Sequence, residues 1–344
     1  MLLTPWEAIS MSKHELLILF AVALPLVGAV DVPSRSGGLL IVANKGDQTV
    51  GIIDPEAGRE IATIKETGFT AHEVIASPDG RTVYAPIYGD SGVGSPGTDG
   101  QTIDVIDIPS RKIVRTIQLD KPTRPHCPKF GPDGRLYVST ELSQSVTVIN
   151  PETNTVVDSL PTGQTESHMF AITSDGKRIY TSNVHVGTVS AIDVAGRKVI
   201  AVIQVSTHAQ RIALAVDDRY VFTADQTEPR LAAIETSTNK VTNWIPLPGI
   251  AYGTAPTPDG RWLLVTLPEL NSIGVVDLNA MKLVRQVAVG KYPQEIVVRP
   301  DGKVAFVSCL KDGKVAAVNL ETWKMDKLIP AGKGVDGLAW AKAD

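Results

Sequence analysis

Short runs of apolar and β-branched residues, each bounded by turn residues, follow one another along almost the whole chain. In the segment that begins near Glu166, such runs occupy 168–172, 178–182, 188–193 and 198–203, and a Ser-Asp-Gly turn separates the first two. Runs of this length and composition predict β-strands, and tight turns between them predict antiparallel hairpins. The segment is therefore expected to form a four-stranded antiparallel sheet.

The same unit recurs along the chain. Six segments carry a Pro-Asp-Gly turn or a close variant, and we call the residue eight positions before the last residue of that turn the ring position. A further step of 42 residues reaches an equivalent position near the C-terminus. The seven ring positions are His72, His126, His168, Gln210, Tyr252, Gln294 and Asp336. A strict period of about 40 to 45 residues predicts a β-propeller, in which equivalent positions of successive blades meet around one axis.

The two chain ends are expected to share one blade. The segment 334–340 supplies only a first strand, and the runs at 39–44, 49–54 and 60–65 match the second, third and fourth strands. Pairing them in one sheet closes the ring and removes exposed strand edges. We predict an all-β fold: a seven-bladed β-propeller of four-stranded antiparallel blades in a single domain over residues 38–344.

The second strands vary around one theme, of which 136–140, 179–183, 220–224 and 304–308 are examples, and the third strands end in Asp or Asn before a turn. This pattern resembles the YVTN-repeat propellers, of which the YncE-like proteins are typical. The resemblance covers nearly all of the repeated region. It implies the architecture and not an activity, because this fold hosts many unrelated functions.

The N-terminal segment differs from the repeats. A basic start precedes an apolar run from Leu16 to Val30 that ends in small residues. This predicts a signal peptide over residues 1–30, with Met11 as an alternative start, and a linker over 31–37. An uncleaved membrane anchor is the alternative, although the run is shorter than the roughly 20 residues that a span needs. We expect an exported protein, periplasmic or secreted, with no membrane span in the mature chain.

Composition and charge narrow the partners. Apolar residues at 43% and charged residues at 20% suit a packed all-β body. A net charge of −4 without a basic run argues against nucleic acid. Cys127 and Cys309 belong to blades that are not neighbours, so we expect two buried free thiols and no disulfide. We expect a monomer.

Three adjacent units carry histidine at the ring position, so His72, His126 and His168 are expected to point at one place. Neutral imidazole binds Zn, Cu, Fe or Ni, and three such ligands leave a coordination position open. We therefore predict one transition metal ion (Zn, Cu, Fe or Ni) held by these histidines, with His208 as a candidate fourth ligand. A proton-transfer or substrate-binding cluster and a plain polar lining of the tunnel are the alternatives.

Because side chains alternate along a strand, the residues two places before the ring positions are expected to line the same mouth one layer higher. In this layer, Glu166 is a candidate general base and His208 is a candidate catalytic residue. Arg124 is expected either to hold an anionic group of a substrate or to pair with Glu166. The remaining candidate substrate-binding residues at this mouth are Gln210, Tyr252, Gln294, Asp336, Tyr292 and His185.

The sequence Arg124-Pro-His126 ahead of a Pro-Asp-Gly turn is similar to inner strands of the nitrous oxide reductase propeller, in which such histidines hold a copper cluster. The resemblance implies that this strand position can carry a metal ligand. The chain has too few ring histidines for that cluster and lacks a cupredoxin domain. We therefore do not expect it to reduce nitrous oxide.

The first unit carries 12 extra residues, 89–100, in a Gly-rich loop beside His72. This insertion is either a flexible lid or a tolerated surface loop. The predicted function is a metal-dependent enzyme that acts on a small molecule, hydrolytic in the manner of a lactonase if the metal is Zn and oxidative if it is Cu or Fe. The alternative is a non-catalytic YVTN-type propeller that binds a protein, peptide or glycan on the same face. Few aromatic residues, 5% of the chain, favour the enzyme over the binding module.

Overall fold

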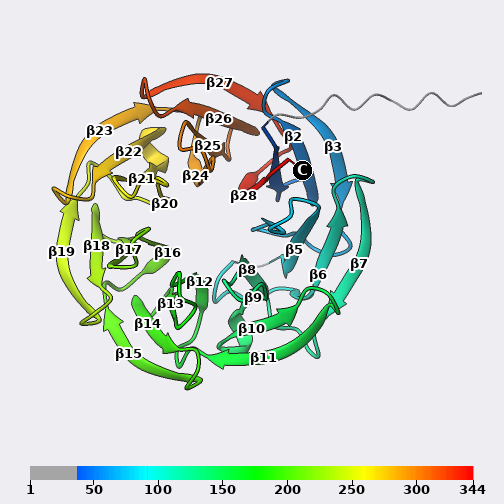
Figure 1. The fold of residues 1–344 in the computed structure, drawn as a ribbon, viewed down its shortest axis with the longest axis horizontal. Coiled ribbons are helices and arrows are strands. Elements are labelled where there is room, and N and C mark those ends of the chain that lie inside the picture. Colours follow the sequence, from blue (N-terminus) through cyan, green and yellow to red (C-terminus); the bar gives the residue numbers. More distant parts are fainter. Residues whose placement is uncertain (1–36, 91, 344) are drawn as a thin grey trace, which may run out of the picture. The chain divides into compact units, whose positions relative to one another are not determined.

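Seven four-stranded antiparallel sheets surround one central axis as the blades of a propeller (Figure 1). The computed structural model describes residues 37–90 and 92–343, which belong to a unit that spans Ser36–Asp344. The predicted seven-bladed β-propeller is confirmed. The predicted signal peptide and almost all of the linker lie outside the described residues. No helix among the described residues is long and apolar enough to cross a membrane.

Each blade runs from an inner first strand to an outer fourth strand. Blade one contains β4 (Ile75–Ala76), β5 (Thr82–Gly89), β6 (Asp99–Asp107) and β7 (Lys112–Gln118). Blade two contains β8 (Pro125–Phe130), β9 (Leu136–Thr140), β10 (Ser145–Asn150) and β11 (Thr155–Pro161), with the short 3₁₀ helix η1 (Glu141–Ser143). Blade three contains β12 (Ser167–Ile172), β13 (Arg178–Asn183), β14 (Thr188–Asp193) and β15 (Lys198–Gln204). Blade four contains β16 (Ala209–Leu214), β17 (Tyr220–Asp225), β18 (Arg230–Glu235) and β19 (Lys240–Pro246).

The remaining three blades complete the circle. Blade five contains β20 (Thr254–Pro256), β21 (Trp262–Leu267), β22 (Ser272–Asp277) and β23 (Lys282–Ala288), with the 3₁₀ helix η2 (Pro268–Leu270). Blade six contains β24 (Pro293–Val298), β25 (Val304–Cys309), β26 (Lys314–Asn319) and β27 (Lys324–Pro330). Blade seven contains β28 (Val335–Ala341) as its inner strand, followed by β1 (Leu39–Asn44), β2 (Thr49–Asp54) and β3 (Arg59–Lys65).

Blade seven joins the two ends of the propeller. β28 pairs antiparallel with β1, and the pairs include Leu39 with Ala341 and Leu40 with Trp340. The predicted sharing of one blade by the terminal strands is therefore confirmed. The pairing hides strand edges that an open array would expose.

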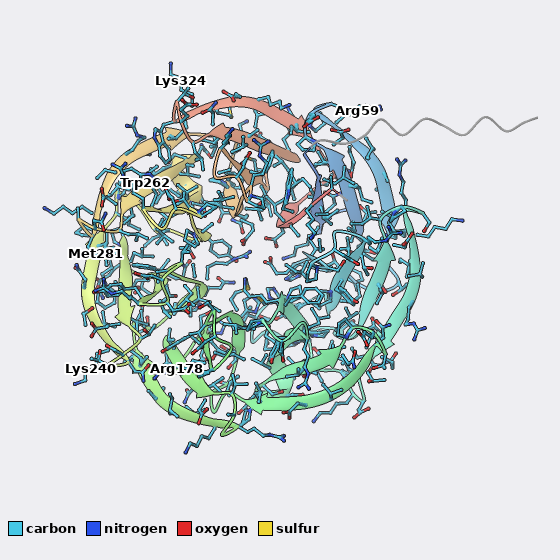
Figure 2. All side chains as sticks on the ribbon, in the orientation of Figure 1. Arg59, Arg178, Lys240, Trp262, Met281 and Lys324 are labelled. Carbon is cyan, nitrogen blue, oxygen red and sulfur yellow. The ribbon has the colours of Figure 1, made fainter. Side chains whose placement is uncertain are left out.

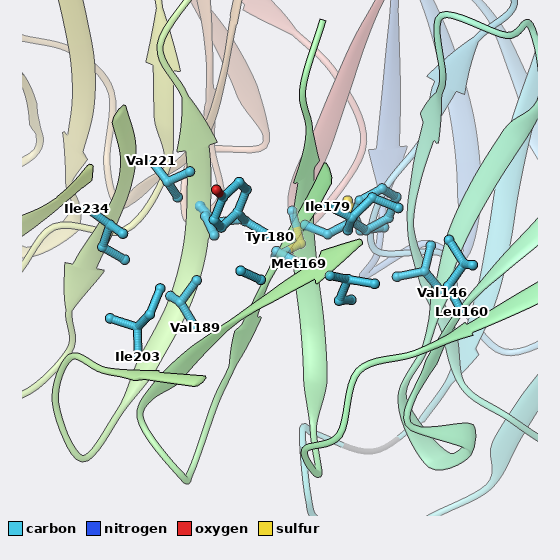
Figure 3. Close-up of a cluster of buried hydrophobic side chains, with 14 of the residues drawn as sticks. Val146, Leu160, Met169, Ile179, Tyr180, Val189, Ile203, Val221 and Ile234 are labelled. Carbon is cyan, nitrogen blue, oxygen red and sulfur yellow. The ribbon is translucent and has the colours of Figure 1, made fainter. Parts of the chain in front are cut away.

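Apolar side chains fill the spaces between blades. Successive side chains of a strand point to opposite faces of its sheet, so each blade contributes to the core on both of its sides. In Figure 3, Met169 and Tyr180 of blade three lie between Val146 of blade two and Val221 of blade four. The outer strands are solvated, and charged side chains such as Arg59 project from them around the circumference (Figure 2). The core thus lies between blades and leaves the axis to the inner strands.

Backbone irregularity at the ring positions distinguishes the inner strands. In blade two, Pro125 pairs with Thr140 and Pro128 with Val138, so His126 and its neighbour stand opposite a single residue, Ser139. Similar register shifts occur in blades three, four, six and seven. In blades one and five the inner strand begins only after the ring position. A bulge of this kind frees side chains from the regular pairing and turns them in a new direction.

Hydroxyl groups of the second strands fix these bulges. The Ser139 hydroxyl accepts a hydrogen bond from the Cys127 amide at 3.0 Å and donates one to the His168 carbonyl at 2.6 Å. In blade five, Thr266 likewise accepts from the Gly253 amide and donates to the Gln294 carbonyl. The Ser or Thr of the second-strand theme therefore links the residue after the ring position of one blade to the ring residue of the next.

Candidate functional site

The imidazole rings of His72, His126 and His168 lie together in the tunnel. The centroids of the His72 and His126 rings are 5.3 Å apart with the rings nearly perpendicular, and those of His126 and His168 are 3.7 Å apart in a tilted stack. All three residues are buried, with at most 7% of their surface exposed. The structure thus brings together the three histidines that the repeat aligns.

One nitrogen of each ring lacks a hydrogen-bond partner among the protein groups. These atoms are Nε2 of His72, Nδ1 of His126 and Nδ1 of His168. A buried polar atom without a partner costs about 1–3 kcal/mol, so each one requires an explanation such as a bound ion or water. The cluster therefore has unused capacity for hydrogen bonding or for coordination.

The rings are not arranged as a ready-made metal site. Among residues 37–90 and 92–343, no group of three or more His, Cys, Asp or Glu side chains is positioned to hold a metal ion. Two imidazoles on one tetrahedral metal, each about 2 Å from it, have ring centres about 5 Å apart. The separation of His72 from His126 meets this condition, whereas the stacked pair of His126 and His168 is too close.

Burial determines the protonation state of the three histidines. It lowers the pKa of His72 and His126 well below the usual value, and neighbouring positive charges act in the same direction. Burial also lowers the pKa of His168, although the Glu141 carboxylate opposes this change. At neutral pH the rings are therefore uncharged, which is the form that coordinates a metal or accepts a proton.

Tyr88 completes the cluster and was not among the candidate residues. Its fully buried ring lies 4.6, 5.2 and 5.9 Å from the rings of His72, His126 and His168, measured between centroids. Its hydroxyl donates a hydrogen bond of 2.5 Å to Oε2 of Glu141. Burial, together with that carboxylate, raises the pKa of Tyr88, so the hydroxyl keeps its proton. The position of Tyr88, immediately before the insertion, was the available signal.

Glu141 is a second residue that the repeat did not reveal. It begins η1, is buried, and places Oε2 3.7 Å from Nδ1 of His168. Burial acts to raise the pKa of Glu141, but the His168 ring and the Tyr88 hydroxyl hold it below its usual range. Glu141 is therefore an ionised carboxylate beside the cluster. Its place directly after the second strand of blade two, in a loop that lines the mouth, could have identified it.

Arg124 holds the inserted loop. Its Nε lies 2.6 Å from Oδ1 of Asp99, its Nη2 donates to the Ser95 carbonyl at 2.7 Å, and its Nη1 lies 3.2 Å from Oε1 of Glu141. The structure thus pairs Arg124 with Asp99 and Glu141, and not with Glu166. Because the buried guanidinium is occupied by these partners, it is a positioning residue for the loop.

The loop at 89–100 lies against blades two and three at the mouth. The Gly94 amide donates to Oε1 of Glu141 at 3.3 Å. Gly94 has a φ of +66°, and a Cβ there would come within 2.3 Å of Oε1 of Glu166 and 3.0 Å of Nδ1 of His185. The absence of a side chain therefore allows the loop to approach both residues closely.

Glu166, His185 and His208 form a separate group at the rim. Nδ1 of His185 lies 2.5 Å from Oε2 of Glu166, and the His185 and His208 rings meet edge to face at 4.4 Å. The His185 side chain is 45% exposed, in contrast to the buried cluster. Burial lowers the pKa of His208, and the nearby His185 adds to this effect. The structure therefore groups His208 with the rim and not with the three ring histidines.

The alternation of side chains along a strand does not extend to the residues two places before the ring positions. Arg124, Glu166 and Tyr292 have φ values of 50°, 54° and 57°, in the left-handed region. These residues are not extended backbone, so the simple alternation argument fails two places before the ring position. Tyr292, for example, lies under the Lys311 ammonium, 3.9 Å from its ring centroid.

Two of the other ring residues, Asp336 and Tyr252, contact the buried Arg211. Oδ1 of Asp336 lies 3.2 Å from Nη2 of Arg211, whose guanidinium also covers the Tyr252 ring at 4.9 Å. Gln210 and Gln294 are linked to their neighbours through carbonyls that accept hydrogen bonds from second-strand hydroxyls. These four residues therefore stabilise the far side of the ring.

Comparison with known proteins supports the fold. No family model and no curated protein matches the sequence. Kuenenia stuttgartiensis hydrazine synthase is 20% identical with a TM-score of 0.71, over 83% of this chain and 93% of that one. A functionally unknown protein from Desulfotomaculum acetoxidans DSM 771 is 13% identical with a TM-score of 0.74, over 90% and 100%. Dihydro-heme d1 dehydrogenase NirN, in complex with DHE, is 15% identical with a TM-score of 0.64, over 88% and 74%. At these identities the likeness establishes a β-propeller and nothing further, and the YVTN-type assignment stays a prediction.

Proposed function

We propose that this protein is an exported metal-dependent enzyme, and that His72, His126 and His168 hold one transition metal ion at which a small molecule reacts. The observation that carries the proposal is the set of three buried, uncharged imidazoles, each with an unpaired nitrogen. Bound water could satisfy these atoms one by one, but it would not account for three such imidazoles at equivalent positions of adjacent blades. A shared metal ion satisfies all three.

Three imidazole nitrogens suit such an ion, but either the His126 or the His168 ring must rotate before all three can bind it. Imidazole nitrogen is a good ligand for Zn, Cu, Fe and Ni, and three such ligands leave a position open for water or substrate. Rotation of either His126 or His168 about its side-chain bonds would separate the stacked rings. A bound ion supplies Lewis-acid chemistry if it is Zn and redox chemistry if it is Cu or Fe.

The surrounding residues have definite tasks in this proposal. Glu141 is ionised and lies 3.7 Å from Nδ1 of His168, the nitrogen offered to the ion, so it is the group placed to accept a proton from a molecule that reacts there. Tyr88 keeps its proton and orients Glu141 through their hydrogen bond. The loop at 89–100 limits the entry of water from the mouth. Glu166 acts with His185 at the entrance and not at the cluster itself.

The similar structures are compatible with catalysis. Two of them carry the names of enzymes, hydrazine synthase and dihydro-heme d1 dehydrogenase. Their propellers show that the architecture occurs in enzymes, and a catalytic role for this chain is our inference from its own site residues.

Elemental analysis tests the proposal. The protein is purified without a metal-affinity tag beside a variant with His72, His126 and His168 all changed to Ala, and beside a control with His185 and His208 changed to Ala. We expect near-stoichiometric Zn, Cu, Fe or Ni in the unmodified protein and in the control, and none in the folded triple variant. If all three are metal-free, and added metal does not raise the melting temperature, the proposal is wrong.

One observation favours the non-catalytic alternative. Four large apolar residues on loops at the mouth face are exposed: Phe69, Leu142, Val186 and Leu270. A contiguous apolar patch is typical of a surface that binds a protein or peptide, and we propose these loops as the place of such a patch. If the protein proves metal-free, this face is the place to seek a binding partner, and charged substitutions at Phe69 and Leu142 should abolish binding.

A further inference from the structure

A cavity of about 390 Å³ occupies the tunnel beyond the ring positions. Inner strands of all seven blades line it, and the lining residues follow the ring positions along these strands. The cavity therefore lies farther from the mouth than the histidine cluster. Its size is typical of a small-molecule site, so the side chains that line it determine which class of molecule it would accept.

The residues three places after the ring positions form one layer of the cavity wall, which we call the alanine layer. The larger members of this layer are half-buried, as expected for side chains on inner strands that point into a tunnel. Four members are alanine, which leaves space at this depth, and one carries a charge. The alanine layer consists of Ile75, Lys129, Ala171, Ala213, Ala255, Val297 and Ala339.

A layer of paired charges lies between the alanine layer and the ring. Nη1 of Arg211 lies 2.6 Å from Oε1 of Glu73 and also pairs with Oε2 of Glu295. Nη2 of Arg211 pairs with Asp336, which also lies 4.0 Å from Nζ of Lys45. Each of these charged groups therefore has a protein partner of opposite charge.

Lys129 has no such partner. Its ammonium group makes no hydrogen bond or ion pair with a residue of 37–90 or 92–343. The carboxyl groups of Glu73 and Glu295 act on it only at longer range than an ion pair. An ammonium group carries three N–H donors, so Lys129 offers the cavity a cation with its hydrogen bonds unused.

We propose that the alanine layer binds a small monocarboxylate with an apolar chain. The carboxylate would accept hydrogen bonds from the Lys129 ammonium, and the chain would lie in the space that the alanines leave. Hydrogen bonds between ionised partners are the strong ones, and one unpaired cation matches one negative charge. An ammonium head group would meet like charge at Lys129, and the second charge of a phosphate monoester would have no partner among the alanines. This site is separate from the histidine cluster and does not depend on a metal ion.

The charge balance of the cavity permits an anion. When all groups are ionised, the charges of Glu73, Arg211, Glu295 and Lys129 cancel, so a bound carboxylate adds one negative charge. Burial raises the pKa of Glu295, although Arg211 and Lys129 oppose this change. Glu295 is therefore placed to compensate the added charge by holding a proton.

Binding of three matched compounds tests the proposal. Hexanoate, hexanol and hexylammonium share a six-carbon body and differ in the head group, and their affinities for the full chain are measured by calorimetry and by the shift of the melting temperature. We expect hexanoate to bind at least about tenfold more tightly than the other two. Because a carboxylate can also bind a metal ion, the measurement is repeated on chelator-treated protein, which should give the same order. A preference for hexanoate that disappears with the chelator would assign the binding to the metal site and overturn this proposal.

A substitution locates the binding. Lys129→Met keeps the length of the side chain and removes its charge and its donors, so it should weaken hexanoate binding by about tenfold or more. Lys324→Met, at an exposed position of β27, is the matched control and should have no effect. The proposal is wrong if hexylammonium or hexanol binds as tightly as hexanoate, or if the Lys129→Met variant retains full affinity. It is also wrong if hexanoate does not bind the unmodified protein at about 10 mM, a result that does not depend on the folding of any variant.

Discussion

At the scale of single residues, Glu66 shows how burial shapes the pH dependence of this fold. It follows β3 in the connection from blade seven to blade one and is only 7% exposed. Burial raises the pKa of the Glu66 carboxyl to about 7, more than the nearby Ala71 amide lowers it. Since the folded chain holds this proton more tightly than the unfolded chain, ionisation of Glu66 opposes folding.

We expect Glu66→Gln to stabilise the protein at alkaline pH. Between the usual pKa of about 4.5 and the raised value of about 7, the unfolded chain releases the proton and the folded chain keeps it, so stability falls as pH rises. Above the raised pKa, both chains have released the proton and the stability falls no further. The variant should therefore gain about 1–3 kcal/mol over the unmodified protein at pH 8 and nothing at pH 4. Urea unfolding at both pH values measures the difference, and the exposed Glu321→Gln serves as the control.

Residues such as Tyr88, Glu141 and Arg211 also mark the limit of the sequence argument. The 42-residue period aligned the ring histidines because it reports equivalent positions, and the structure brings those histidines together. Tyr88 and Glu141 reach the cluster from the ends of second strands, and Arg211 occupies the position after the ring. Their roles depend on where the ends of the second strands and the bulges direct each side chain, and the period does not encode these directions.

At the scale of elements, strand boundaries were predictable and backbone irregularities were not. The expected runs at 178–182 and 188–193 correspond to β13 and β14 within one residue, because alternating apolar residues and turns are local signals. The bulges at the ring positions arise from hydrogen bonds between blades, such as that from Ser139 to the His168 carbonyl. A local pattern cannot specify such contacts. Strand alternation therefore did not predict the conformation of the residues two places before the ring positions.

The insertion at 89–100 provides a prediction at this scale. A methyl group at Gly94 would collide with Glu166, so we expect Gly94→Ala to release the loop from the rim. Gly134 has a similar φ of +76° but no atom within 4 Å of an added Cβ, so Gly134→Ala carries the same backbone strain without the collision. Hydrogen exchange of the loop amides should accelerate severalfold in the first variant only. Equal exchange in the two variants would mean that the loop is not held by its contact with Glu166.

At the scale of the whole molecule, the closure of blade seven determines whether the ring is one cooperative structure. β28 is the inner strand of that blade, and it also packs against blade six, where the rings of Phe306 and Trp340 stack 5.6 Å apart. Removing β28 would leave β1 as an exposed edge beside the tunnel and would uncover the core between blades six and seven. Because adjacent blades share their cores, the damage would spread beyond one blade.

We therefore expect a chain that ends at residue 334 to lose most of its stability, which for a domain is on the order of 5–15 kcal/mol, and to aggregate. A circular permutant distinguishes closure from the mere loss of residues. It joins residue 343 to residue 38 through a short flexible linker and opens the chain in the exposed turn near Gly134, so that every strand is kept. The permutant should unfold in a single transition close to that of the unmodified protein. A truncated chain that stays soluble and unfolds at the same urea concentration would show that six blades and an incomplete seventh are sufficient, and that closure by the terminal strands is not what holds the ring together.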